Sequence, residues 1–323
     1  MLTIRFRKYG KYYHNIRNKI IHWSNLLTDP DPKLLILTYH RIVPEIKNNP
    51  LKTIVPLNVF MKQADAIAKK FSVISLNEAV NQIREGRIKD KIQVVFTFDD
   101  GYRDNYETLF PFLSKKGLPA AFSITTDCVG SDLPLWDWEM IMRLSSNENI
   151  DEVMAEGYSL KRQAGEAQLS FALRLFEAMR YSDGRILRSV IDFLRERTPG
   201  YDFGGDGFMS WAQIKQMSDA GMDIGAHGVS HRSLGTMPLD EASDEILKSK
   251  LLIEANTRRD CYFFAFPFGS KRDYNETLIG KVKEARFKAC LLNIHGYNRI
   301  KPGAFCFKRI IMDESTNPDF LLG

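Results

Sequence analysis

The 323-residue chain is too long for one small domain, and its 44% apolar, 11% aromatic and 26% charged residues exclude a disordered or fibrous protein. No run of about 18 uncharged apolar residues occurs, so the sequence predicts no membrane-spanning helix. The formal net charge of +5 equals the net charge of residues 1–30, so the rest of the chain is neutral in sum and lacks the basic face of a general nucleic-acid-binding protein.

Residues 1–32 are predicted to form a basic N-terminal helical arm. Its basic residues alternate with aromatic and aliphatic ones and precede no continuous apolar core, so they do not form a secretory signal. We therefore expect a cytoplasmic protein. One alternative is an amphipathic helix in peripheral contact with the cytoplasmic face of an anionic membrane; a solvated extension or a helix packed on the domain are the others.

Strands and helices alternate after Asp29-Pro30-Asp31-Pro32, which breaks any helix and marks the start of the domain. Apolar and β-branched runs predict buried strands at 34–39, 71–75, 94–98, 120–125, 222–225, 262–266, 287–293 and 307–312. Helical patterns occur at 57–70, 76–83, 105–116, 210–220, 239–255 and 274–284, and Gly117 closes the third of these helices. This alternation predicts an α/β fold with a mostly parallel sheet.

The alternation stops between residue 133 and about residue 205. This stretch is charged, mostly helical in pattern, poor in strand signals, and ends in the glycine-rich sequence DFGGDGF. We interpret it as a helical insertion that interrupts a barrel spanning residues 33–323.

The four cysteines are Cys128, Cys261, Cys290 and Cys306. No two of them have the CxxC spacing of a metal or redox motif, and four cysteines in a chain this long make no disulfide framework. Cys261 and Cys290 lie in strand-like apolar runs, which predicts buried free thiols.

Two adjacent carboxylates, Asp99 and Asp100, directly follow the strand predicted at 94–98. Functional residues of parallel α/β folds gather at this end of the strands. Adjacent carboxylates repel, and each raises the proton affinity of the other unless a cation relieves them, as a metal ion would. One helix N-cap plus one solvated acid is the alternative interpretation.

His227 and His231 follow the strand predicted at 222–225. Two histidines four positions apart can reach one ion from a single turn, although such pairs are more often solvated or core residues. One aspartate with two histidines leaves open positions for water, which suits catalytic Zn²⁺ or another divalent transition ion. The second aspartate is then well placed as a base for the water.

These motifs resemble those of the polysaccharide deacetylases of carbohydrate esterase family 4, which share the chitooligosaccharide deacetylase homology domain. FTFDDGY at 96–102 resembles the first motif of the family and GAHGVSH at 225–231 the second. The resemblance covers about residues 34–130 and 205–312, and it includes LTYHRI at 37–42, WAQIKQMSDAGMDIG at 211–225 and FAFPFGS at 264–270. It implies a distorted (β/α)₇ barrel.

The resemblance also implies roles for individual residues. Asp100, His227 and His231 would bind one divalent metal ion, Zn²⁺ in the first place, with Co²⁺, Ni²⁺ or Mn²⁺ as alternatives. Asp99 would be the general base, and the backbone N–H of Tyr102 would stabilise the oxyanion.

Three positions depart from the family pattern or match it weakly. The third motif, commonly Arg-x-Pro-Tyr-Gly, reads AFPFG at 265–269, so Ala265 replaces the arginine that holds the base, while Phe268 keeps the backbone donor and loses a hydroxyl. His40 or Arg41 is our candidate to orient Asp99 instead, with helix capping as the alternative. His295, which follows the strand predicted at 287–293, is the candidate general acid, although its local sequence does not clearly match; otherwise it is a loop histidine.

The sequence does not decide the role of the first residues of the insertion. Asp137 and Trp138 in LWDWEM could face the cleft, but aromatic residues at a domain seam are more often packing residues.

The sequence therefore predicts a hydrolase of non-peptide carbon–nitrogen bonds that removes N-acetyl groups. Its expected partner is an amino-sugar-containing polysaccharide or its lipid-linked precursor, in exopolysaccharide or cell-envelope metabolism, and not nucleic acid. Two alternatives are a deformylase of an acylated amino sugar on a lipid carrier and a catalytically silent carbohydrate-binding barrel, which would bind no metal.

Overall fold

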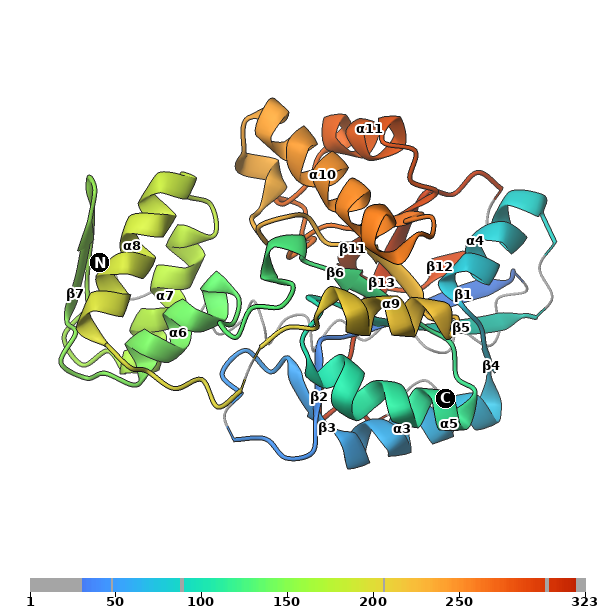
Figure 1. The fold of residues 1–323 in the computed structure, drawn as a ribbon, viewed down its shortest axis with the longest axis horizontal. Helices are drawn as coiled ribbons and strands as arrows, with labels where there is room; N and C mark the ends of the chain where they lie inside the picture. The colour runs from blue at the N-terminus through green and yellow to red at the C-terminus, as the bar shows by residue number, and fades with distance from the viewer. Residues whose placement is uncertain (1–30, 48, 88–89, 206, 300–301, 318–323) are drawn as a thin grey trace.

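The computed structural model describes residues 31–47, 49–87, 90–205, 207–299 and 302–317 (Figure 1). Residues 1–30 of the predicted basic arm lie outside the described residues. No helix within the described ranges is both long and apolar enough to cross a membrane.

The centre of the fold is a closed barrel of parallel strands. Starting from β1, each barrel strand pairs in parallel with the next, and β1 pairs with both β5 and β13, which closes the circle. The barrel strands are β1 (Lys33–Tyr39), β5 (Ile92–Phe98), β6 (Ala120–Ile124), β9 (Asp223–Ala226), β10 (Phe263–Ala265), β11 (Ala289–His295) and β13 (Cys306–Ile311). The expected (β/α)₇ barrel is confirmed.

Two short strands extend the same sheet. The predicted strand at 71–75 is reduced to β4 (Ser72–Val73), which pairs in parallel with β5 outside the circle. β12 (Asn298–Arg299) pairs in antiparallel fashion with the start of β1 and was not predicted, because two residues carry no readable pattern.

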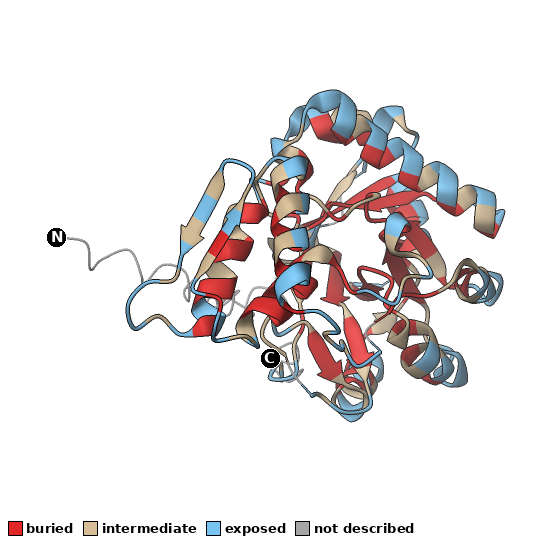
Figure 2. Ribbon diagram, turned by 60° about the vertical axis from the view of Figure 1, so that its left-hand side comes forward, coloured by how far each residue is buried: buried red, intermediate tan, exposed pale blue. Residues whose placement is uncertain are grey.

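Helices cover the outside of the barrel, and their buried faces point toward the strands (Figures 1 and 2). They are α3 (Leu57–Lys70), α5 (Phe110–Lys116), α9 (Trp211–Asp219), α10 (Leu239–Thr257) and α11 (Glu276–Glu284). α4 (Leu76–Glu85) packs instead against the opposite face of the barrel wall. The ends of these helices are set by side-chain hydrogen bonds and by backbone conformation. Ser75 accepts a hydrogen bond from the backbone of Glu78 at the start of α4, Ser210 and Gln213 form a capping box at the start of α9, and Gly117 ends α5 in the left-handed conformation.

Alternate residues of β1 face opposite sides of the barrel wall. Leu35, Leu37 and Tyr39 pack in the cluster beneath the surrounding helices. Leu34 and Ile36 pack in a second cluster that also contains apolar residues of α4. Because both faces of the strand are buried, the consecutive residues 34–37 are all apolar.

The segment between β6 and α9 builds its own hydrophobic core and lies at the left of Figure 1. It consists of α6 (Trp136–Ser145), β7 (Glu152–Ala155), β8 (Tyr158–Lys161), α7 (Gln168–Met179) and α8 (Gly184–Arg197). The segment was predicted to be mostly helical; it contains three helices, and the antiparallel hairpin formed by β7 and β8 was not predicted. Its half-exposed strands are short and mixed in polarity, so they gave no strand signal.

Two further details were not predicted. β2 (Arg41–Val43) and β3 (Ile54–Pro56) form a small parallel sheet beside the barrel, too short to be read from sequence. The expected helix at 105–116 begins with a π-helical turn, Asn105–Leu109, before α5. The expected free thiols are confirmed: all four cysteines are free, and Cys261 and Cys290 are buried.

Candidate active site

The candidate site residues lie at the carboxyl ends of the barrel strands. Asp99 and Asp100 directly follow β5, and the backbone N–H of Asp99 donates to the carbonyl of Tyr39 at the end of β1. His227 follows β9, and its backbone N–H donates to the carbonyl of Ile124 at the end of β6. Neighbouring strands therefore fix the main chain on both sides of the site.

The backbone around the site adopts conformations that most residues avoid. Asp100 has a φ of 77° and His231 a φ of 53°, both in the left-handed region. Gly225 is required at the approach to His227, because a Cβ atom there would lie 2.3 Å from the ring of Phe263. Strained, non-glycine positions of this kind persist where the surrounding structure holds them, often at functional sites.

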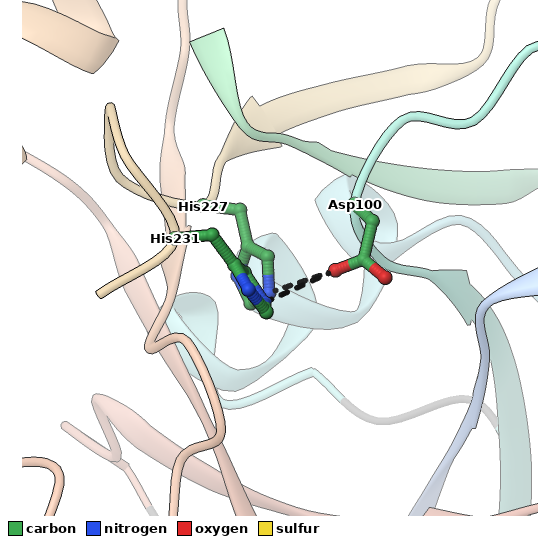
Figure 3. A group of neighbouring side chains, drawn as sticks. All are labelled: Asp100, His227 and His231. Carbon is green, nitrogen blue, oxygen red and sulfur yellow. Dashed lines mark ion pairs between the residues drawn. The ribbon is translucent and has the colours of Figure 1, made fainter. Parts of the chain in front are cut away.

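Asp100, His227 and His231 converge on one point (Figure 3). Asp100 Oδ1 lies 3.5 Å from His227 Nε2 and 3.3 Å from His231 Nε2. The three residues are nearly inaccessible, at 5%, 1% and 5% exposure respectively. Within the described ranges, this is the group of three side chains whose ligand atoms lie close enough to share a metal ion.

Each histidine presents Nε2 to the shared point because its Nδ1 faces another group. His227 Nδ1 lies 2.8 Å from the carbonyl oxygen of Ala265 and donates to it. His231 Nδ1 lies 3.5 Å from Asp137 Oδ2 in α6. Protein ligands of metal ions commonly orient their imidazoles in this way.

The donor set fits a divalent transition ion. Asp100 Oδ1 is buried and has no hydrogen-bond donor in the described part of the chain, which leaves it available to a cation. Ligands bound at 2.0–2.1 Å around a tetrahedral ion are separated by about 3.3 Å, which is close to the two distances observed here. One carboxylate and two imidazoles with open positions suit Zn²⁺ and its neighbours in the transition series.

The charges of the site are set by burial and by contacts between opposite charges. Burial raises the pKa of Asp100, but His227 and His231 outweigh it and hold that pKa well below the ordinary range. Burial lowers the pKa of His231, while Asp137 and Asp100 raise it to about 10. A cation bound between these groups would take the place of the proton on His231.

Asp99 is held by a residue that the sequence analysis did not identify. Arg309 Nη1, from β13, lies 2.8 Å from both carboxylate oxygens of Asp99 and donates to Oδ1. Both side chains are completely buried. Burial raises the pKa of Asp99, but Arg309 and His227 bring it below its usual value, so the carboxylate is charged at neutral pH.

The expectation that Arg41 orients Asp99 is corrected by this contact. Arg41 Nε donates to Asp104 Oδ2 at 2.7 Å instead, and the Arg41 guanidinium lies over the ring of Tyr102 at 4.7 Å. His40 is half-buried and lowers the pKa of Asp99 and Asp100 electrostatically, while its carbonyl accepts from Asn105. His40 is thus near the site, but the hydrogen bond to Asp99 comes from Arg309.

Tyr102 follows Asp100 by two residues, and Phe268 packs against His231. Tyr102 is buried, and its ring stacks on Phe208 with centroids 4.6 Å apart. Phe268 adopts a φ of 59° after β10 and packs 4.8 Å from the imidazole of His231. Their proposed roles toward an oxyanion or substrate stay predictions.

His295, the candidate general acid, is the last residue of β11 and is half-buried. A register shift between Leu292 and His295 makes His295 the partner of Arg309 on β13. His295 therefore lies beside Arg309, the residue that holds Asp99, on the neighbouring strand. Its role as general acid stays a prediction.

Two other residues support the site: Glu245, which was not identified from sequence, and Asp137, whose role the sequence left open. Glu245 of α10 accepts from the backbone N–H groups of Val229 and Ser230, at 2.6 and 2.9 Å, and thereby holds the loop between the two histidines. Asp137 was left open between the cleft and packing, and the structure places it beside His231. For Arg309 the signal in the sequence was a charged residue beside the two apolar residues that end the strand, although the adjacent Lys308, which is exposed, is charged as well.

Comparison with known proteins shows the family to which the chain belongs. The family model for polysaccharide deacetylase matches residues 86–173 and 177–290. A curated protein of Bacillus subtilis (strain 168), YxkH, whose name places it among the polysaccharide deacetylases, is 24% identical over 189 residues, which cover 55% of this chain and 65% of YxkH.

Solved structures show the same fold. The Streptococcus pyogenes deacetylase PplD in complex with acetate matches with a TM-score of 0.60 and 19% identity, over 90% of this chain and 97% of PplD. IcaB from Ammonifex degensii matches with a TM-score of 0.57 and 18% identity, over 90% and 95% of the two chains. The polysaccharide deacetylase BC0361 from Bacillus cereus matches with a TM-score of 0.58 and 16% identity, over 90% and 68%.

Proposed function

Because the chain belongs to the polysaccharide deacetylase family, we propose that it is a metal-dependent hydrolase that removes N-acetyl groups from an amino-sugar-containing glycan or its lipid-linked precursor. The observation that carries this proposal is the placement of a charged, buried Asp99 directly beside the Asp100, His227 and His231 cluster. Such a site combines an ion-binding group with a base in the protonation state that hydrolysis needs.

The reaction adds water across the C–N bond of the acetamide and yields acetate and a free amine. A divalent ion, when bound, lowers the pKa of water and polarises the amide carbonyl. Asp99 accepts the proton of the attacking water, and Arg309 keeps its carboxylate charged and fixed in orientation. The backbone N–H of Tyr102 faces the developing oxyanion, and His295 protonates the departing amine.

Support for acetyl as the acyl group that is removed comes from one of the similar solved structures. The PplD structure contains acetate, the acid released from an N-acetyl group. The chain of YxkH is matched over only 65% of its length, so the substrate and the activity of the whole protein belong to this proposal. Zn²⁺ is the proposed ion, with Co²⁺, Ni²⁺ or Mn²⁺ as alternatives, and the glycan is proposed to be reached from the cytoplasmic side.

The test combines metal analysis of the purified protein with release of acetate or formate from a panel of acylated amino sugars and their oligomers. The proposal expects one ion per chain and acetate release. Formate release alone would replace it with a deformylase, and absence of both metal and turnover would leave a silent carbohydrate-binding barrel.

Two variants separate the base from the ion site. Asp99→Asn should retain the metal and lower kcat by about 10²–10⁴, as expected for removal of a general base. His231→Ala should lose both metal and turnover, because one of three ligands is removed. Full turnover by Asp99→Asn would show that the base is another residue.

A further inference from the structure

Asp137, the second residue of α6, faces one of the candidate metal ligands from outside the barrel. Its Oδ2 lies 3.5 Å from His231 Nδ1, on the side of the imidazole opposite to Asp100. We propose that Asp137 is a positioning residue that holds His231 in the orientation and tautomer needed for metal binding, so that the insertion is a working part of the metal site. This inference rests on the metal site proposed above.

The carboxylate of Asp137 is itself held in place. It is 5% exposed, and its Oδ1 accepts from the backbone N–H of Trp138 at 2.7 Å, which leaves Oδ2 directed at His231. At 3.5 Å the approach to His231 is an electrostatic contact longer than a good hydrogen bond. Binding of an ion at Nε2 fixes the ring proton on Nδ1, where Asp137 is the acceptor.

A second contact from the same helix supports this role. Trp136 Nε1, from the first residue of α6, donates to the backbone carbonyl of His231 at 2.9 Å. His231 has a φ of 53°, a conformation that costs energy for a residue other than glycine. The first turn of α6 therefore contacts both the side chain and the main chain of His231.

The two histidine ligands differ in what supports them. His227 is oriented by a carbonyl of the barrel itself, that of Ala265. His231 depends on a carboxylate supplied by a segment inserted about a hundred positions earlier in the chain. A charged acceptor strengthens the basicity of the imidazole more than a carbonyl does, so its removal should weaken ion binding measurably.

The test measures the affinity for Zn²⁺ of the full-length protein by competition with a chromophoric chelator, after removal of bound metal. Asp137→Asn should weaken Zn²⁺ binding by about 10–100-fold, the range found for partners of metal ligands. The matched control is Glu139→Gln on the same helix, a buried carboxylate that pairs with Arg143 and Arg195. The affinity of Glu139→Gln for Zn²⁺ should stay within twofold of that of the original protein. Unfolding of both metal-free variants, followed by circular dichroism, shows whether either substitution destabilises the fold.

Each outcome is decisive. An affinity for Asp137→Asn within twofold of the original protein would overturn the proposal, and so would equal losses in Asp137→Asn and Glu139→Gln, because the effect would then come from the fold of α6. Failure of the original protein to bind Zn²⁺, Co²⁺, Ni²⁺ or Mn²⁺ would instead refute the metal site of the proposed function, and this inference with it.

Discussion

Arg309 and Asp99 lie 210 positions apart in the chain, yet Arg309 Nη1 is 2.8 Å from both oxygens of the Asp99 carboxylate. Both side chains are completely buried. Phe307, two residues before Arg309, packs in the same cluster as Ala265, so this side of β13 and Ala265 face the same space. Arg309 thus supplies from β13 the charge that the family pattern places at position 265.

Arg309→Met should leave Asp99 buried without its cation. Because Arg309 lowers the pKa of Asp99 and burial raises it, the pKa should rise, and the acidic limb of the kcat/KM profile should move to higher pH. Metal content should not change. The measurement is a pH–rate profile with metal analysis, and Arg309→Lys, which keeps the charge, should shift the limb less. An unmoved limb in Arg309→Met would contradict the role.

His295→Asn should lower kcat for an N-acetyl sugar by about 10²–10⁴ without loss of metal, because the amine would leave unprotonated. An aryl acetate ester, whose phenolate leaves without a proton, should be hydrolysed at nearly the original rate by the same variant. Equal losses on both substrates would argue that His295 positions the site and is not the acid.

Arg180 of the insertion forms an ion pair with Asp273, which lies between β10 and α11 of the barrel domain. Its Nη2 lies 2.5 Å from Asp273 Oδ2, and Asp273 is completely buried. Arg180→Met would leave that carboxylate without its cation and should reduce the free energy of unfolding by about 3–5 kcal/mol, measured by urea denaturation. The control is Arg185→Met, whose pair with Asp183 is exposed, so its loss should change the free energy of unfolding much less than the loss of the Arg180 pair. Similar effects of the two substitutions would contradict this account.

Asp223 should make the protein less stable as the pH rises. It accepts from the backbone N–H of Asn77 at the start of α4, and burial raises its pKa to about 6. The folded chain therefore holds a proton that the unfolded chain releases near pH 4, so stability is full below that pH and is lost as the pH rises through 6.

Asp223→Asn should remove this dependence. A two-unit shift corresponds to about 3 kcal/mol, and the measured difference should be smaller because Asp223 is only half-buried and water screens its charge. Urea denaturation of both proteins at pH 4.5 and pH 7.5 checks the effect. A stability difference between the two pH values that is the same in both proteins would refute it.

Patterns within short segments of the sequence were sufficient to predict much of the fold. The strand β5 consists largely of apolar and β-branched residues, and Gly117 ends α5 in the left-handed conformation. Both features depend on residues that are close together in the sequence. The hairpin β7–β8 was missed because its strands have only four residues each, too few for the alternation in β8 to stand out in the sequence. Only the packing of α8 and the rest of the insertion core against this hairpin makes it stable.

The sequence alone determined that Asp100, His227 and His231 could share an ion, because each follows a strand and the carboxyl ends of parallel strands meet at one edge. Only the tertiary structure decided which groups support them. The pairing of Arg309 with Asp99, and of Asp137 with His231, depends on which side chains from distant segments are buried together. A buried charge must find an opposite charge in space, and its distance along the chain does not restrict where that partner comes from.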